Sequence, residues 1–187
     1  DATGNNNNGV LTNGPTRASS TCKISNCLNF NGVNSYVDLG TPPVDNFGTS
    51  DFSLAGWINT ASTSGALIAN QNSGGLSGFT FQLSGNIMYF RTSDALANWS
   101  VTTGLKPVNN SVWHFVVATR SGTTQSIYVD GGLDNSNAVT LRDVGNGNTL
   151  YIGIYRPTVP IDSPLNGWLD DVRIYNRALG ASEVKSI

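Results

Sequence analysis

The sequence FTFQL-SGN-IMYFR, residues 79–91, places two alternating segments on either side of a turn-forming tripeptide. Apolar and polar residues alternate in the first segment, so Phe79, Phe81 and Leu83 share one face, as in a strand with one buried side. Serine, glycine and asparagine are frequent in tight turns. The stretch therefore predicts a β-hairpin whose phenylalanine face contacts a hydrophobic core.

Similar signals recur along the whole chain. Short apolar segments separated by Gly, Asn, Ser and Thr fall at residues 28–30, 36–39, 52–59, 114–119, 125–129, 149–154 and 168–175. Short strands at such spacing favour two antiparallel sheets packed face to face. Near the end, Gly180 as N-cap and Glu183 in the first turn predict one short helical turn. We expect a single all-β sandwich domain over residues 1–187, a length that such sandwiches reach undivided.

Charge and hydropathy exclude two classes of partner. Only 12% of the residues are charged, and the formal net charge is −2 with no basic run. A nucleic-acid partner is therefore not predicted, because phosphate neutralisation needs a basic patch. No apolar stretch approaches the length of a membrane span, so membrane insertion is not expected either.

The two cysteines, Cys22 and Cys27, are separated by four residues. This spacing suits a small disulfide loop, whereas zinc and redox motifs place two residues between their cysteines. Two free thiols are the alternative. A disulfide predicts an oxidising compartment, and hence a secreted or cell-surface protein.

Several segments resemble the laminin-G-like branch of the concanavalin A-like lectin/glucanase superfamily. The most specific is the closing segment GWLDDVRIYNRAL at 167–179; weaker similarities cover LNFNGVNSYVDL at 28–39, FSLAGW at 52–57, WHFVVA at 113–118 and IYVDG at 127–131. The resemblance implies a jelly-roll β-sandwich, one sheet of which is often concave, and places Trp57 and Trp113 in core-strand motifs. Members of the superfamily bind sugars, bind proteins or cleave polysaccharides, so the function has to be decided from the site.

The carboxylates and the histidine argue against catalysis. Glycoside hydrolysis usually needs two carboxylates beside the scissile bond, but the single glutamate, Glu183, lies in the C-terminal helical turn. Asp170 and Asp171 are adjacent, so their side chains should point to opposite faces of a strand. The superfamily's polysaccharide lyases use a histidine with a tyrosine, and the only histidine here, His114, lies in a core-strand motif. We therefore predict that the domain is not an enzyme.

The resemblance also implies a structural calcium ion. In many relatives the first acidic residue of the closing motif helps to hold calcium beside the first long strand, and Asp170 stands at that position. Asn31 and Gly32 match the partner segment, and calcium favours hard oxygen ligands that include backbone carbonyls. The alternative is that Asp170 accepts hydrogen bonds from neighbouring backbone amides.

A sugar site needs exposed aromatic rings together with planar polar groups. Trp99 lies in a polar segment where no pattern requires burial, and Tyr155 and Arg156 open a loop that contains three prolines. On the hairpin, Gln82, Tyr89 and Arg91 occupy the face opposite the phenylalanines. We take these six residues as candidate ligand contacts; packing of Tyr89 against the core and simple solvation of Arg91 are the alternative.

Two functions remain at this stage. The first is a glycan-binding, lectin-like module without catalytic activity, whose partner is a polysaccharide or oligosaccharide. The second is a structural or adhesive domain of a bacterial surface or pilus-like protein, which binds protein or no soluble ligand. Convergence of Trp99, Tyr155, Tyr89 and Arg91 on one surface would favour the first.

Overall fold

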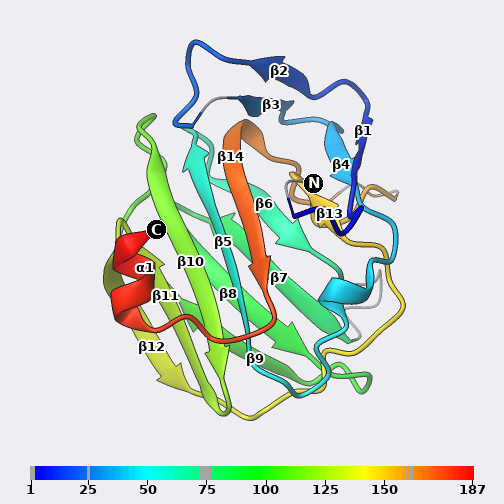
Figure 1. Ribbon diagram of the computed structural model, residues 1–187, viewed down its shortest axis with the longest axis vertical. Coiled ribbons are helices and arrows are strands. Elements are labelled where there is room, and N and C mark those ends of the chain that lie inside the picture. Colours follow the sequence, from blue (N-terminus) through cyan, green and yellow to red (C-terminus); the bar gives the residue numbers. More distant parts are fainter. Residues whose placement is uncertain (1–2, 25, 72–76, 159, 161) are drawn as a thin grey trace.

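The computed structural model describes residues 3–24, 26–71, 77–158, 160 and 162–187, and these form two antiparallel seven-stranded sheets (Figure 1). Sheet A has the order β1 (Val10–Thr12), β4 (Tyr36–Asp38), β13 (Tyr151–Ile152), β6 (Ser64–Ala69), β7 (Gly78–Ser84), β8 (Ile87–Ser93) and β9 (Trp99–Thr103). Sheet B has the order β12 (Gly132–Ala138), β11 (Thr124–Val129), β10 (His114–Ser121), β5 (Phe52–Asn59), β14 (Asn166–Tyr175), β3 (Cys27–Asn31) and β2 (Thr16–Ala18). The predicted jelly-roll sandwich is confirmed.

The predicted β7–β8 hairpin is present, and the predicted face of Phe79, Phe81 and Leu83 is buried. Phe81 pairs with Phe90, and Gln82 pairs with Tyr89 across the two strands. The connection is a two-residue turn at Gly85 and Asn86, where Gly85 adopts a positive φ that suits glycine.

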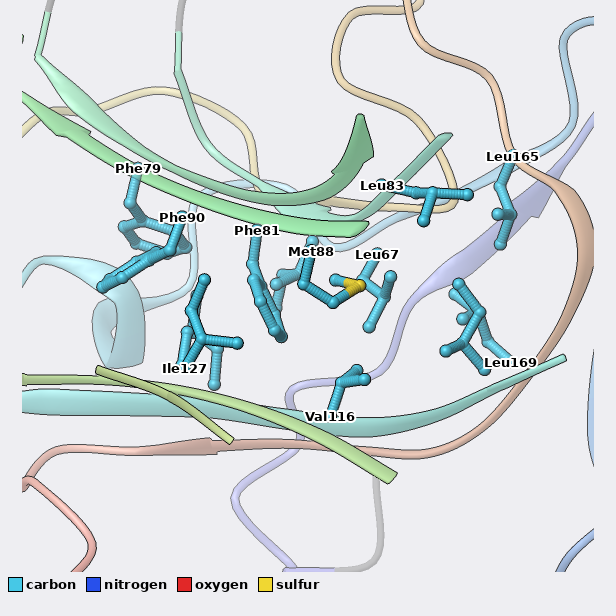
Figure 2. Packing of buried hydrophobic residues seen from close by; sticks show 14 of the residues in the cluster. Leu67, Phe79, Phe81, Leu83, Met88, Phe90, Val116, Ile127, Leu165 and Leu169 are labelled. Carbon is cyan, nitrogen blue, oxygen red and sulfur yellow. The ribbon is translucent and has the colours of Figure 1, made fainter. Parts of the chain in front are cut away.

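The core lies between the two sheets. Figure 2 shows the phenylalanines of β7 and β8 pointing from sheet A towards Val116 and Ile127 of sheet B. The side chains of Phe79, Phe81, Leu83, Met88 and Phe90 are completely buried there. Burial of each such side chain contributes about 2 kcal/mol, so this contact fixes which face of each sheet points outward.

The expected C-terminal helical turn is α1 (Ala181–Ser186), with Gly180 as N-cap. The backbone N–H of Gly180 donates a hydrogen bond to Glu183, which also pairs with Arg177. Leu179 and Val184 pack on the outer face of sheet B, and α1 lies in front of β10 and β11 in Figure 1. The other helical element of the described residues is a 3-10 turn, η1 (Pro43–Asp45). No helix among these residues is long and apolar enough to cross a membrane.

Arg120 is a buried cation at one end of the core. Its side chain is 1% exposed and lies over the Phe52 ring at 4.7 Å. The guanidinium donates hydrogen bonds to the backbone carbonyls of Ser50, Arg142 and Gly48, the latter two at 2.8 and 2.9 Å. Burial lowers the pKa of Arg120 to about 10, so it stays charged at neutral pH. Arg120 thus joins two connecting loops to the end of β10.

Replacing Arg120 with alanine should destabilise the domain by about 3 kcal/mol, because the change leaves a cavity and several buried carbonyls without a donor. Urea unfolding of Arg120→Ala measures this loss. Arg17→Ala, at an exposed position of β2, is the matched control and should stay within about 0.5 kcal/mol of the wild type. Equal effects of the two substitutions would contradict the structural role of Arg120.

Asp45 is a buried carboxyl in η1, 4% exposed, which accepts a hydrogen bond from the amide of Asn70 at 3.1 Å. Burial raises its pKa from the ordinary 3.8 to about 6. Folding therefore favours the protonated form. This contribution to stability is full below pH 3.8 and is lost as the pH rises through about 6.

Asp45→Asn should therefore raise the free energy of unfolding at pH 7, by up to about 3 kcal/mol, because the amide carries no charge and can still accept from Asn70. Between pH 4 and 7 the wild type should lose stability relative to the variant. Chemical denaturation at several pH values measures the difference. Parallel curves for the two proteins across this range would show that the carboxyl is not perturbed.

Candidate functional site

The outer face of sheet A carries the hairpin residues that the alternation predicted to point outward. Gln82, Tyr89 and Arg91 are partly exposed, whereas the phenylalanines of the same strands are buried. Trp99 begins the edge strand β9 and is 55% exposed. Arg91 pairs with Val101 of β9, so the three strands β7, β8 and β9 present these side chains on one surface.

The loop that opens at Tyr155 covers the neighbouring part of this face. The Tyr155 ring is 6% exposed and packs on Ala66 and Ala69 of β6, whose small side chains leave room for it. A bridge between Arg156 and Asp162 closes the base of the loop, with paired backbone hydrogen bonds and a 2.8 Å ion pair. The loop thus forms a wall beside the open strands β7 to β9.

Arg91 connects this wall to the open surface. Its Nη2 donates a hydrogen bond to the Tyr155 hydroxyl at 2.8 Å and contacts the side-chain oxygen of Gln71. The Tyr155 hydroxyl donates to the same Gln71 oxygen at 2.8 Å, and burial raises the pKa of Tyr155, so the phenol remains a neutral donor. The guanidinium carbon lies 5.4 Å from the Tyr155 ring centre and 5.2 Å from that of Trp99.

Tyr155, Arg91 and Trp99 therefore converge, although they are distant in sequence. Gln82 and Tyr89 are cross-strand partners on the same face. We call Gln82, Tyr89, Arg91, Trp99 and Tyr155 the outer-face cluster. A sugar contact would need an exposed ring, whereas the Tyr155 ring is buried. Tyr155 therefore supports Arg91 through its hydroxyl group and is not itself open to a ligand.

Two further residues refine this picture. Arg156, the sixth candidate, pairs with Asp162 and lies 5.1 Å from the Tyr155 ring, so it belongs to the wall. Gln71, only 2% exposed, was not predicted from the sequence. It lies two residues after the end of β6, and no periodicity or motif marks an isolated glutamine as the partner of an arginine twenty residues away.

The outer face of sheet B is covered in part by the disulfide loop. Cys22 and Cys27 form the predicted bond. Between them, the Lys23 ammonium lies 4.4 Å from the Trp57 ring centre, and just before them the carbonyl of Thr21 accepts a hydrogen bond from the Trp113 indole at 3.0 Å. The loop is thus held on the sheet by two tryptophans.

These contacts show how Trp57 and Trp113 pack. Both are half-buried, and Trp57 packs against the outer cluster of sheet B rather than the core between the sheets. Trp57 packs on Phe115 with the ring centres 5.2 Å apart. The sequence motif placed both tryptophans in strands that contribute to the core, but alternation turns these two positions outward.

The three residues expected to share a calcium ion do not form one ligand set. The Asp170 carboxylate accepts a hydrogen bond from the Ile24 amide at 2.6 Å. Asn31 pairs with Asn166, four residues along β14 from Asp170 and therefore roughly 13 Å away.

The Asn31 side chain and the Gly32 amide have hydrogen-bond partners within the protein. The Asn31 side-chain oxygen accepts from three backbone amides, those of Val33, Asn34 and Ser35, and the Gly32 amide donates to Leu165. Within the described residues no group of three or more His, Cys, Asp or Glu side chains is placed to hold a metal. Asp170 lies apart from Asn31 along the β3–β14 pair, and calcium binding remains an untested prediction.

A further cavity lies away from the outer-face cluster. It measures about 690 Å³ and opens beside the N-terminal segment, where β3 and β14 diverge. Its walls include the apolar side chains of Leu28, Val37 and Ile152, with Asp170 and Asp171 at one end. Of the residues predicted to contact a glycan or calcium, only Asp170 lines this cavity.

The two packed antiparallel sheets define the class as a jelly-roll β-sandwich. The chain belongs to the concanavalin A-like lectin/glucanases superfamily, because the Laminin_G_3 family model, which carries that description, matches residues 31–185. The resemblance stated from the sequence is thereby confirmed. Comparison with curated protein sequences finds no match.

Solved structures of toxin binding domains share the fold. The binding domain of Paraclostridial Mosquitocidal Protein 1 superposes with a TM-score of 0.80 at 20% identity over 100% of this chain and 48% of that one. The botulinum neurotoxin serotype G binding domain gives a TM-score of 0.73 at 18% identity, over 97% and 46% of the two chains. This chain therefore spans about half the length of these domains, and at such identities the likeness concerns the fold alone.

Removing the disulfide should loosen its loop from sheet B. Replacing Cys22 and Cys27 together with serine is expected to lower the free energy of unfolding by about 2 kcal/mol, a value typical of a short loop. It should also increase acrylamide quenching of tryptophan fluorescence, because Trp57 and Trp113 lose their cover. Urea unfolding and quenching measure the two effects. As a control, dithiothreitol should produce both effects in the wild type and should change nothing further in the double variant, which has no disulfide. Unchanged quenching after the substitution would contradict the docking of the loop.

Proposed function

We propose that this domain binds a glycan on the outer face of sheet A and does not cleave it. The observation that carries the proposal is the exposed Trp99 ring beside the Arg91 guanidinium, on a surface that also presents Gln82 and Tyr89. Sugar rings stack on aromatic faces, and amide and guanidinium groups bind their hydroxyls. The buried hydrogen bonds from Arg91 to Tyr155 and Gln71 hold this surface in place before a ligand arrives, which lowers the entropic cost of binding.

The charged groups support binding without hydrolysis. The outward positions of β7, β8 and β9 carry no acidic residue; they are Gly78, Thr80, Gln82, Ser84, Ile87, Tyr89, Arg91, Ser93, Trp99, Val101 and Thr103. Asp94, in the turn after β8, is ion-paired with Arg142 at 3.2 Å. Glu183 lies on the opposite sheet and pairs with Arg177. A sugar on the outer-face cluster would therefore lack the carboxylate pair that glycosidases use.

Two further observations support an extracellular binding module. The disulfide is typical of oxidising compartments. The structurally similar domains of the mosquitocidal protein and the botulinum neurotoxins are named as binding domains. We carry over to this chain only the general role of binding, with a glycan as the partner on the strength of the outer-face cluster.

Trp99→Ala should weaken glycan binding about fivefold or more, because the stacking surface is lost, while the melting temperature stays within a few degrees of the wild type. Leu133→Ala, at a position of sheet B that is equally exposed (56%), is the control and should leave binding unchanged. A glycan array identifies the ligand, and calorimetry compares the variants. Mass spectrometry after prolonged incubation should find the oligosaccharide intact.

Shortened oligosaccharides in that incubation would contradict the non-catalytic assignment. Loss of folding in Trp99→Ala would show that Trp99 supports the structure rather than the ligand. Absence of any glycan binding would leave the structural or adhesive function in its place.

A further inference from the structure

The outer-face cluster contains a cation without an acidic partner. The ion pairs among the described residues involve His114, Arg142, Arg156, Arg173 and Arg177, and Arg91 takes part in none of them. The hydrogen-bond partners of its guanidinium, Tyr155 and Gln71, are both neutral.

Partial burial strengthens the interaction of the Arg91 charge with an approaching anion. Arg91 is only partly exposed, and its Nε atom is buried without a hydrogen-bond partner in the described residues. The rings of Trp99 and Tyr155 lie 5.2 and 5.4 Å from the guanidinium carbon and displace water from it. A charge in such surroundings is screened less than one in open water, so an approaching anion gains more from it.

The neighbouring charges leave this surface positive, although the whole chain carries a net charge of −2. Asp162 is paired with Arg156, and Asp94 is paired with Arg142. These two pairs cancel locally, and the outward positions of β7 to β9 add Arg91 and no carboxylate. A guanidinium is well suited to carboxylate and sulfate groups because its planar N–H donors match their oxygens.

From this juxtaposition we propose that the outer-face cluster prefers acidic glycans, meaning oligosaccharides with a carboxylate or sulfate group. Arg91 contacts the acidic group through Nη1, which forms no hydrogen bond within the described residues, while Trp99 stacks on the sugar ring. The inference rests on the proposed glycan-binding function and adds the chemical class of the ligand.

The test compares glycans that differ only in charge. Tetragalacturonate and its methyl ester share one backbone, and lactose and its sulfated derivative form a second pair. The wild type should bind the acidic member of at least one pair about tenfold more tightly than the neutral member. Raising sodium chloride from 0.05 to 0.5 M should weaken binding of the acidic member alone, because salt screens the Arg91 charge.

Variants assign the preference to Arg91. Arg91→Gln should abolish the difference within the pair, and Arg91→Lys should keep part of it, since the charge remains but the planar donor group is lost. Arg17→Gln, at an exposed position on sheet B, changes the net charge equally and should leave the preference intact. Melting temperatures of all variants verify folding, and the salt dependence tests the proposal on the wild type without any substitution.

Equal binding of both members by the wild type, or a preference that survives in a folded Arg91→Gln variant, would overturn the acidic specificity and leave glycan binding itself intact. Binding of neither pair, nor of any other glycan on an array, would instead remove the proposed function together with this inference.

Discussion

Contact between the phenylalanine face of the β7–β8 hairpin and sheet B is the constraint on which the rest of the structure depends. Phe52 of β5 packs against Phe79 and Phe90 with ring centres 5.2 and 5.8 Å apart, so the two sheets are joined through aromatic side chains. Side chains alternate along a strand, and burial of one set forces the other set outward. A register shift of one residue would bury Arg91 and expose Phe90, at a cost of several kcal/mol.

The outer faces of the two sheets differ in how far other parts of the chain cover them. That of sheet B is covered by α1 over Phe115 and Val117 and by the disulfide loop near Trp57. On sheet A, Tyr155 packs on the alanines of β6, and the outward residues Thr80 and Ser93 are also buried. Gln82, Tyr89 and Arg91 stay partly exposed, and Trp99 is exposed. This asymmetry leaves one surface of the sandwich with aromatic and polar side chains available to a ligand.

Within that surface, Arg91 has two roles that reinforce one another. Its hydrogen bonds to Tyr155 and Gln71 fix the loop against the sheet, and its position between two aromatic rings leaves its charge poorly solvated. The same arrangement therefore organises the surface and places on it a positive charge that pairs with no carboxylate among the described residues.

The sequence by itself determined the fold class, the buried and outward faces of the hairpin, and the disulfide, because each depends on local pattern or short spacing. It also identified Trp99 and Arg91 individually, since a polar context and strand alternation mark outward positions. Only the tertiary structure decided that Arg91 lies between Trp99 and Tyr155 with Gln71 behind it, and that Asp170 bonds to Ile24 far from Asn31. These are contacts between segments 8 to 146 residues apart, and they depend on strand order and loop paths that no local pattern specifies.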